Sequence, residues 1–414
     1  MPLLAVDFAE MVETPYPFRG CFGADSMVFC RNNMDIGFIT AAYKPAPGGV
    51  TTSVESFAEQ LEKLGHRVTI FCPTYPQQTE DIADVKRIRS FLTPIIPDFR
   101  ITDPLEARRI FSNNFPALDL IHIHLPTLMS RPARKIAQKN GLPFFFTYHT
   151  HLELYLGHYL PLIPAGMSRQ AAKWYTRLTT RGGATIFTPS KDLKEVLKGY
   201  SLKPPIKVLP TGIALSFYEK PRSSVRERYG IGPDEKMVLY VGRIGSEKNI
   251  DFLLKAFDQI RQKYPNCHFV MVGGGRGMER ALRQRSRLGL EETIHFPGYI
   301  EDREEVAAHY QSSDLFIFAS LTETQGLVIL ESFASNTPVV AVDAPGIRDF
   351  MAGNRGGFLT EMDLEKFSNT AVQLLQDQRI WEEKTREGKE VAREYSTEAM
   401  AVELLETYKR HLVT

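Results

Sequence analysis

From Met34 onward, short runs of β-branched and aromatic residues alternate with longer amphipathic stretches. This alternation is typical of parallel βαβ units, in which a helix connects each strand to the next. The expected strands form two sets with the same rhythm, at 35–40, 67–71, 120–124, 143–149, 184–189 and 206–209, and then at 237–242, 268–273, 293–296, 315–319, 339–342 and 357–359. We therefore expect an α/β fold of two doubly wound, Rossmann-like domains that face each other across a cleft.

The break between the two sets falls at Leu209-Pro-Thr-Gly212, where Pro and Gly interrupt the pattern. A chain of 414 residues exceeds one ordinary core, which supports more than one domain. We expect a first domain at 34–212, a second at 213–381 and a closing helical segment at 382–414, for which packing back on the first domain is one alternative. Residues 1–33 precede the first strand, and they are either an extension or lie before the true start at Met34.

Composition indicates a soluble globular protein, with 43% hydrophobic and 24% charged residues. The chain lacks the roughly 18 consecutive apolar residues of a membrane-spanning helix, and its first residues lack the pattern of a signal peptide. The four cysteines are scattered without the spacing of metal ligands or of a disulfide framework. We expect a cytoplasmic enzyme with reduced thiols and no zinc.

Glu323 and Glu331 are separated by seven residues, and Glu331 stands in an otherwise apolar run. A buried, unpaired carboxylate is costly unless something is bound to it. Thr322 and Gln325 have capping-box spacing, which predicts a helix start whose free amides near Gly326 favour anions and oxygen-rich groups. The alternative to a ligand site is a helix cap plus a structural carboxylate that meets an Arg, and the spacing leaves both open.

Two further motifs follow predicted strands. Gly48 and Gly49 precede an apolar-periodic helix at 54–64, so their amides could face a phosphate, although paired glycines are also a common turn. Arg243 and Lys248 lie five residues apart in a Gly-containing loop. They could clamp a diphosphate or form a solvated surface pair.

Tyr299 and three histidines also follow or end predicted strands. Tyr299 closes the run Phe296-Pro-Gly-Tyr299, which could offer backbone groups to a nucleobase or be a plain turn. His149 ends a buried-looking strand, where it could bond a substrate or serve a structural role. His122 and His124 share one face of another strand, but no carboxylate or Cys stands nearby to complete a metal site. We expect no metal.

The segment from Ser130 to Lys203 is strongly basic, with 12 Lys and Arg against three acids. Within it, cations recur every four residues along one side of a predicted helix, at Arg169, Lys173, Arg177 and Arg181. Trp174, Tyr175 and Leu178 add apolar surface, a combination that suits anionic lipid headgroups. A solvated basic helix packed on its own domain is the alternative. Nucleic acid is less favoured because no nucleic-acid motif accompanies the charge.

The chain from Met34 to its end resembles the retaining family 4 glycosyltransferases, whose motifs occur in the same order: Gly48-Gly49-Val50, His149, Arg243 with Lys248, and Glu323 with Glu331. The resemblance implies a GT-B fold, with a nucleotide-sugar donor held mainly by the second domain and the acceptor by the first. It implies retention of configuration. The chain contains no Asp-x-Asp pair to hold a metal, and Arg243, Lys248 and amides at the helix start could stabilise the departing diphosphate, so we expect no metal or other cofactor.

The family also implies a role for each motif. Arg243 and Lys248 would contact the donor diphosphate, and Glu331 the ribose hydroxyls. Glu323 would contact the transferred sugar, and His149 would lie near its reacting carbon. The amides of Gln325, Gly326 and Leu327 would assist at sugar and phosphate. Gly49, next to Gly48, would close over the diphosphate.

The runs Thr322–Gly326 and Thr147–His151 are similar to those of bacterial enzymes that glucosylate diacylglycerol. This finer resemblance implies transfer of a hexose, with glucose from UDP-glucose as the first choice, to a lipid at the inner face of the cytoplasmic membrane. The chain departs from the family at two places: the segment Ala41-Ala-Tyr-Lys-Pro45 lacks the acidic residue common after the first strand, and Ala214 stands where many relatives have Asp. A soluble sugar, sugar-phosphate or glycan acceptor, a sugar-nucleotide epimerase and a non-catalytic nucleotide-binding protein remain alternatives.

Overall fold

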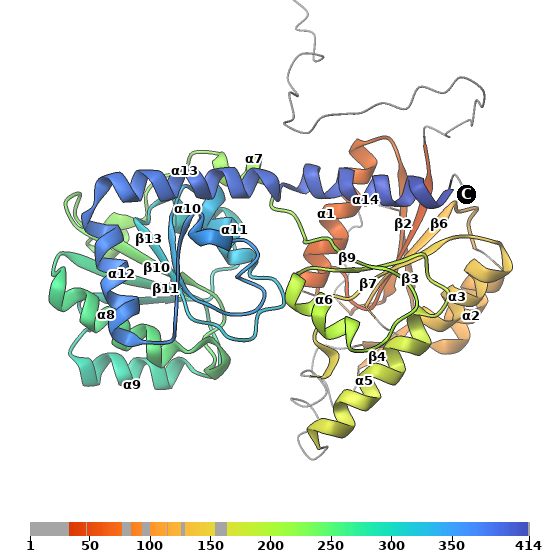
Figure 1. Ribbon diagram of the computed structural model, residues 1–414, viewed down its shortest axis with the longest axis horizontal. Coiled ribbons are helices and arrows are strands. Elements are labelled where there is room, and N and C mark those ends of the chain that lie inside the picture. The colour runs from red at the N-terminus through yellow and green to blue at the C-terminus, as the bar shows by residue number, and fades with distance from the viewer. Residues whose placement is uncertain are drawn as a thin grey trace, which may run out of the picture.

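The computed structural model describes residues 33–46, 48–76, 84–92, 100–113, 115–125, 129–153 and 164–412. The expected extension at 1–33 therefore lies outside the described residues, apart from Asn33. Two parallel sheets, each covered by helices, lie side by side along the long axis of the molecule (Figure 1). This arrangement confirms the two Rossmann-like domains expected from the sequence.

The first sheet has seven parallel strands in the order β3-β2-β1-β6-β7-β8-β9. Their bounds are β1 (Asp35–Thr40), β2 (Arg67–Pro73), β3 (Asp84–Ile88), β6 (Leu120–His124), β7 (Phe144–Thr147), β8 (Thr185–Thr188) and β9 (Ile206–Val208). The sequence predicted all of these except β3, an edge strand whose side chains are mostly charged and partly exposed. A short antiparallel pair, β4 (Ser90–Leu92) and β5 (Arg100–Thr102), was also missed.

Helices cover both faces of the first sheet. They are α1 (Gly49–Lys63), α2 (Pro104–Asn113), α3 (Ser130–Lys139), α5 (Ala165–Thr180), α6 (Lys191–Lys198) and the last helix of the chain, α14 (Thr397–Leu412). Residues on β2 alternate between the two faces: Val68 and Ile70 pack with α1 and α14, whereas Phe71 packs with α2 and α3. This alternation is the two-residue period of a strand buried on both sides.

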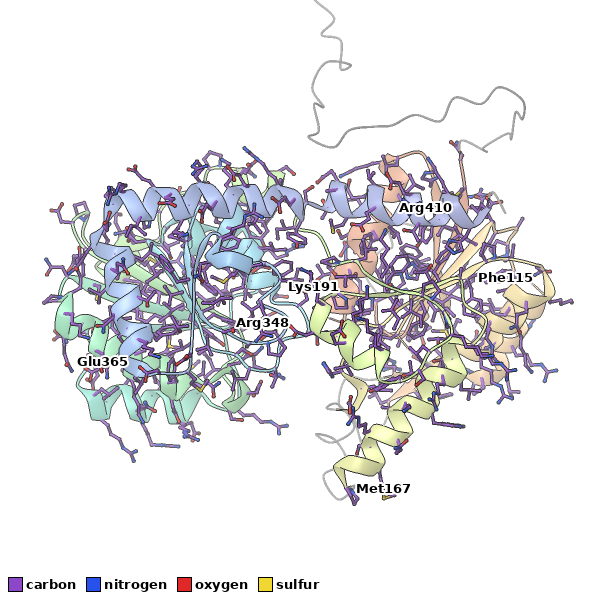
Figure 2. The ribbon with its side chains drawn as sticks, viewed as in Figure 1. Phe115, Met167, Lys191, Arg348, Glu365 and Arg410 are labelled. Carbon is purple, nitrogen blue, oxygen red and sulfur yellow. The ribbon has the colours of Figure 1, made fainter. Side chains whose placement is uncertain are left out.

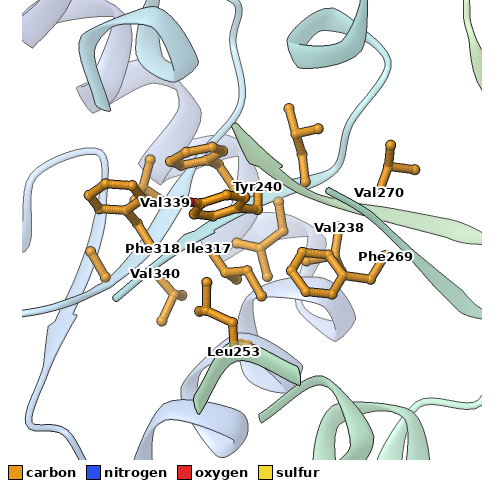
Figure 3. Packing of buried hydrophobic residues seen from close by; sticks show 14 of the residues in the cluster. Val238, Tyr240, Leu253, Phe269, Val270, Ile317, Phe318, Val339 and Val340 are labelled. Atoms are coloured by element: carbon orange, nitrogen blue, oxygen red, sulfur yellow. The ribbon is translucent and has the colours of Figure 1, made fainter. Parts of the chain in front are cut away.

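The second sheet has six parallel strands in the order β12-β11-β10-β13-β14-β15. Their bounds are β10 (Lys236–Val241), β11 (Cys267–Val272), β12 (Ile294–Gly298), β13 (Leu315–Phe318), β14 (Val339–Val342) and β15 (Gly357–Thr360). All six were predicted. In the core, Val238 and Ile317 pack with Leu253 without exposure to solvent (Figure 3).

The second domain has its own set of helices. These are α7 (Leu215–Glu219), α8 (Ile250–Lys263), α9 (Met278–Leu288), α10 (Arg303–Gln311), α11 (Leu327–Ala334), α12 (Leu364–Gln376) and α13 (Gln378–Glu394), with short 3-10 turns at Arg226–Tyr229, Ser246–Lys248 and Ala352–Asn354. The closing segment that the sequence predicted as helical is two helices, α13 and α14, which follow each other along one side of both domains (Figure 1).

The chain passes between the domains twice. It first leaves β9 through Gly212 and Ile213, and it returns through Ser396 to α14, whose Leu404 and Tyr408 are buried in the core of the first domain. The two crossings touch: the Ile213 N–H donates to Tyr395 O at 2.9 Å, and a Cβ on Gly212 would lie 2.6 Å from Ser396 O. Gly212 therefore permits the close approach of the two crossings.

Candidate active site

The two domains contact each other at the carboxyl ends of their strands. Asp192, in α6 after β8, accepts hydrogen bonds from the Gly346 N–H and from the Arg348 guanidinium, each at 3.3 Å. Asp349 accepts a hydrogen bond from the Lys191 N–H at 2.6 Å, and Figure 2 shows Lys191 and Arg348 where the domains meet. Because Gly346 and Arg348 follow β14, the carboxyl edges of the two sheets face each other. Doubly wound α/β folds bind their ligands at such edges.

Lys248 and Glu323 form an ion pair between the loops that follow β10 and β13, with side chains only 16% and 17% exposed. The same loops are joined by Asn249, which donates to Ala319 O at 2.8 Å. A Cβ on Gly346 would lie 2.4 Å from the carbonyl oxygen of Glu323, and its φ of 75° also favours glycine. The structure thus brings two predicted donor-site residues into direct contact.

Arg243 lies in the same loop as Lys248 but is far more exposed, with 70% of its side chain accessible. Its guanidinium is 2.7 Å from the Glu247 carboxylate. The Tyr240 hydroxyl donates to the Arg243 carbonyl oxygen at 2.9 Å and fixes the backbone here. Glu247 therefore neutralises the Arg243 charge, while most of the guanidinium stays accessible to solvent.

Glu331 lies within α11 and accepts a hydrogen bond from the Tyr310 hydroxyl at 2.9 Å. Burial raises the pKa of Glu331 above its usual value, and hydrogen bonds from Tyr310 and Tyr218 and the charge of Arg303 oppose that rise. The carboxylate thus has tyrosine partners, and the charge of Arg303 agrees in part with the Arg that the structural alternative expected. A carboxylate has about four lone-pair sites, so these hydrogen bonds orient the group and leave acceptor capacity for a ligand.

Gln325 does not form the capping box that its spacing predicted. Its side chain instead pairs with the backbone of Thr211 at the domain crossing, accepting from the N–H at 2.9 Å and donating to the carbonyl at 2.7 Å. The expectation of free amides is also wrong for two residues: the Gly326 N–H donates to Gly346 O and the Leu327 N–H to Gln325 O, both at 2.9 Å. The tertiary contact with Thr211 has overridden the local pattern.

Gly48 and Gly49 form the start of α1, five residues earlier than the sequence predicted. A Cβ on either glycine would meet no atom within 4 Å, so a ligand can approach this helix start closely. Tyr299 follows β12 and is 72% exposed, and its Cβ lies 3.4 Å from the position of a Cβ on Gly274. Gly48 and Gly49 thus lie in the first domain, and Tyr299 lies in the second.

His149 follows β7, which ends at Thr147, two residues earlier than predicted. Its Nε2 is 3.1 Å from Nδ1 of His124 on β6, and the two rings are stacked. Burial lowers the pKa of His149 to about 3, so the ring is neutral near pH 7. His122 bonds Thr147 Oγ1 at 2.6 Å and the Tyr408 hydroxyl.

Within the described residues no cluster of three or more His, Cys, Asp or Glu is arranged to hold a metal ion. His122 and His124 are instead engaged with protein groups. Cys72 and Cys267, the cysteines that the structure describes, are buried in the cores of the two domains.

Comparison with known proteins decides the family. Residues 47–217 match the model for glycosyltransferase family 4, and residues 221–394 match that for glycosyl transferases group 1. Alpha-monoglucosyldiacylglycerol synthase of Streptococcus pneumoniae is 32% identical over 339 residues, which cover 79% of this chain and 75% of that protein. The chain is a family 4 glycosyltransferase.

Other relatives of this glycosyltransferase differ in their sugar donor. The GDP-mannose-dependent alpha-mannosyltransferase of Mycobacterium tuberculosis is 27% identical over 341 residues, covering 78% of this chain and 83% of that one. The crystal structure of Anabaena HepE in complex with UDP-glucose has a TM-score of 0.68 at 17% identity, covering 90% of this chain and 99% of that one. The GT-B fold and a nucleotide-sugar-dependent transfer activity follow for this enzyme.

Helix α5 of the glycosyltransferase has both a packed side and an unusual exposed side. Ala172 and Thr176 are fully buried, whereas Met167, Trp174 and Leu178 are exposed along one stripe. Met167 lies at the tip of the helix, far from the second domain (Figure 2). No helix in the described parts of the chain is long and apolar enough to cross a membrane.

Of the four predicted cations, Arg169, Lys173 and Arg177 lie on α5 and Arg181 directly follows it, and two of the four have partners in the domain. Arg169 is 3.7 Å from the Glu153 carboxylate, and Arg177 donates to Tyr200 O at 2.7 Å. Lys173 is half-buried, and Arg181 is exposed at the end of the helix.

Several residues that shape the glycosyltransferase site were not singled out from the sequence. Glu247 neutralises Arg243, Tyr310 orients Glu331, and Asp192 joins the two domains. Among these, only Glu247 could have been found from spacing, because it is four residues from Arg243 within one loop. His124 was considered from the sequence only as a metal ligand and was not expected to be one, and its contact with His149 was not foreseen.

Proposed function

We propose that this enzyme transfers a glucosyl group from UDP-glucose to diacylglycerol at a membrane surface, with retention of configuration and without a metal ion. The observation that carries the lipid acceptor is the exposed stripe of Met167, Trp174 and Leu178 on α5, a helix that also contains Arg169, Lys173 and Arg177. An amphipathic helix with aromatic and basic residues binds anionic bilayers by burying its apolar side among the headgroups. The pneumococcal relative is named for a product that is a glucosylated diacylglycerol, and this name supports the same acceptor.

The proposed donor site is built from the charges that already lie together in the free enzyme. Lys248 and Arg243 each exchange a carboxylate for an oxygen of the donor diphosphate when the nucleotide sugar binds. Glu323, released from Lys248, then accepts hydrogen bonds from hydroxyls of the transferred glucose. Glu331, held by Tyr310, accepts hydrogen bonds from the ribose.

The proposed chemistry follows from where charge develops. The bond between the anomeric carbon and the diphosphate oxygen breaks, and the acceptor oxygen attacks from the same face. The acceptor proton passes to the departing oxygen. Lys248 and Arg243 stabilise the negative leaving group, which is the part a metal ion plays in other transferases. His149 lies on the first-domain side of the reacting carbon.

Transfer of labelled glucose in vesicles tests this proposal. We expect glucosyl-diacylglycerol from UDP-glucose in vesicles that contain anionic lipid and diacylglycerol, without added metal and in the presence of EDTA. Replacing Trp174 and Leu178 together by Ser should reduce sedimentation with vesicles and transfer, while Val402→Ser, an exposed apolar position on α14, should change neither. Activity that depends on EDTA-removable metal would contradict the metal-free mechanism.

The same assay separates the rival functions. Activity on a soluble sugar or sugar phosphate, unaffected by vesicles and by the Trp174 and Leu178 replacements, would contradict the lipid acceptor. A changed sugar nucleotide formed in the absence of any acceptor would indicate an epimerase. A preference for GDP-mannose over UDP-glucose would change the proposed donor but not the residues proposed to bind it.

A further inference from the structure

Three histidine rings are stacked at the carboxyl end of the first sheet. The centroids of His122 and His124 are 4.2 Å apart, and those of His124 and His149 are 5.4 Å apart, with interplanar angles of 24° and 17°. Phe38 packs on His124 at 4.7 Å. His124 is fully buried, whereas His149 is half-buried at the domain boundary. The buried middle ring is thus in contact with the ring that borders the site.

The hydrogen bonds of His124 are incomplete. Its Nδ1 lies 3.1 Å from His149 Nε2, but its buried Nε2 has no hydrogen-bond partner among the described residues. Burial lowers the pKa of His124 and of His149, so both rings are neutral near pH 7. A neutral imidazole has one N–H and one lone pair, so the tautomer of either ring fixes that of the other.

The two possible arrangements differ in what they leave unpaired at Nε2 of His124. If the proton were there, a fully buried N–H would have no acceptor. If the proton is on Nδ1, only a lone pair is left without a partner. Buried N–H groups without an acceptor are rarer than acceptors that lack a donor. His124 therefore donates from Nδ1 to Nε2 of His149, and His149 carries its own proton on Nδ1.

We propose that His124 is a positioning residue that holds His149 in the Nδ1–H tautomer, so that this N–H donates a hydrogen bond to a hydroxyl of the transferred sugar. The contact with the sugar rests on the proposed function, whereas the effect of His124 on the His149 tautomer does not. His149 is half-buried and its Nε2 is taken by His124, so Nδ1 is the ring nitrogen that remains for a ligand. His122, held by Thr147 and Tyr408, supports the stack from the inner side.

Nitrogen NMR of the protein with labelled histidine tests the tautomer directly. The chain has 10 histidines, and the His149 signals are assigned by their loss in His149→Gln. We expect Nδ1–H for His149 in the wild type and Nε2–H in His124→Phe, which keeps the aromatic packing but removes the donor. His124→Asn, whose amide can donate from the position of Nδ1, should restore Nδ1–H.

Tyr408→Phe is the matched control, since it removes a buried hydroxyl from the same cluster without touching the contact between His124 and His149. It should lower the thermal midpoint and leave the His149 tautomer unchanged. An Nε2–H form of His149 in the wild type, or an Nδ1–H form in folded His124→Phe, would overturn the positioning role.

Kinetics test the contact with the sugar. In His124→Phe we expect kcat to fall roughly five- to tenfold, the size of one neutral hydrogen bond. KM for the donor should change little, and His124→Asn should recover most of the rate. A tautomer that switches while kcat stays constant would refute the sugar contact. A wild type with the expected tautomer but no transfer from any nucleotide sugar would refute the proposed function and leave the role of His124 standing.

Discussion

Lys248 and Glu323 form an ion pair in which each side chain should depend on the other for its contribution to the free energy of unfolding. Each side chain is about one-sixth exposed, at 16% and 17%, so removal of one leaves the other charge poorly hydrated and without a partner. Breaking a buried pair in this way costs about 3–5 kcal/mol, and breaking an exposed pair costs about 0.2–1 kcal/mol. The intermediate burial here places the expected loss for Lys248→Met or Glu323→Gln near 2 kcal/mol, an order-of-magnitude value between these limits.

The double variant should be no less stable than either single one, because neither charge is then left alone. We expect a total loss of about 2 kcal/mol and a coupling energy of about 2 kcal/mol, within the range for residues in contact. All three variants should lose transfer activity, since both side chains belong to the proposed donor site. The losses in free energy of unfolding of the two single variants would then be strongly non-additive, whereas each single variant and the double variant would lack activity.

The two tryptophans provide the assay. Trp381 donates to Asp314 O at 2.7 Å within the second domain, whereas Trp174 is exposed on α5 of the first. In a Trp174→Phe background, urea unfolding followed by Trp381 fluorescence therefore reports on the domain that contains the pair. The matched control is Arg243→Gln with Glu247→Gln in the same loop, for which the coupling should stay below about 1 kcal/mol because Arg243 is exposed. Single-variant losses that add within about 0.5 kcal/mol would refute the reasoning.

Three further predictions use other contacts. Tyr310→Phe removes a hydrogen bond that lowers the pKa of Glu331, so this pKa should rise further. On acidification, the affinity for UDP should therefore begin to fall at a higher pH in the variant than in the wild type. Calorimetric titrations from pH 8 to pH 5 in which both proteins lose affinity at the same pH would contradict this. Gln325→Leu leaves the Thr211 N–H and carbonyl unpaired, so amide hydrogen exchange at the domain crossing should become faster. The free energy of local opening there should fall by about 1–3 kcal/mol. Unchanged exchange at the crossing would show that the Gln325 side chain does not hold it. Leu404→Ala should destabilise the first domain by about 2–5 kcal/mol, because Leu404 is buried in its core. Val402→Ala on the exposed side of α14 should cost less than about 0.5 kcal/mol. Unfolding is followed by Trp174 fluorescence in a Trp381→Phe background, and equal losses would refute the burial argument.

The fold was predictable to a large extent because strands of parallel sheets are buried on both faces and stand out as apolar runs. The exceptions have physical reasons. The edge strand β3 has charged residues at Asp84 and Lys86, so it lacks such a run. Helix α1 starts at Gly49 rather than Val54 because its first turn contains Gly and Thr in place of the apolar periodicity used to predict it.

The site was predictable as a set of residues but not as a set of contacts. Lys248 and Glu323 were both chosen, yet their pairing joins positions 75 residues apart and depends on adjacent strands β10 and β13. His124 and His149 meet because β6 and β7 are neighbours in the sheet. For Gln325, the local spacing favoured a cap, and only the folded chain reveals the alternative partner at Thr211.

The return of α14 to the first sheet makes the second domain an insertion within the first. During synthesis, the strands from β1 to β9 appear first, but the helix that covers one face of their sheet is made last. At about 5–20 residues per second, the ribosome needs roughly 10–40 s to travel from the first crossing to α14. Throughout that interval the apolar side chains that will contact Leu404 and Tyr408 remain uncovered, while the second domain can already fold. The domain whose strands are translated first is therefore completed last, and until then it exposes apolar surface that favours aggregation.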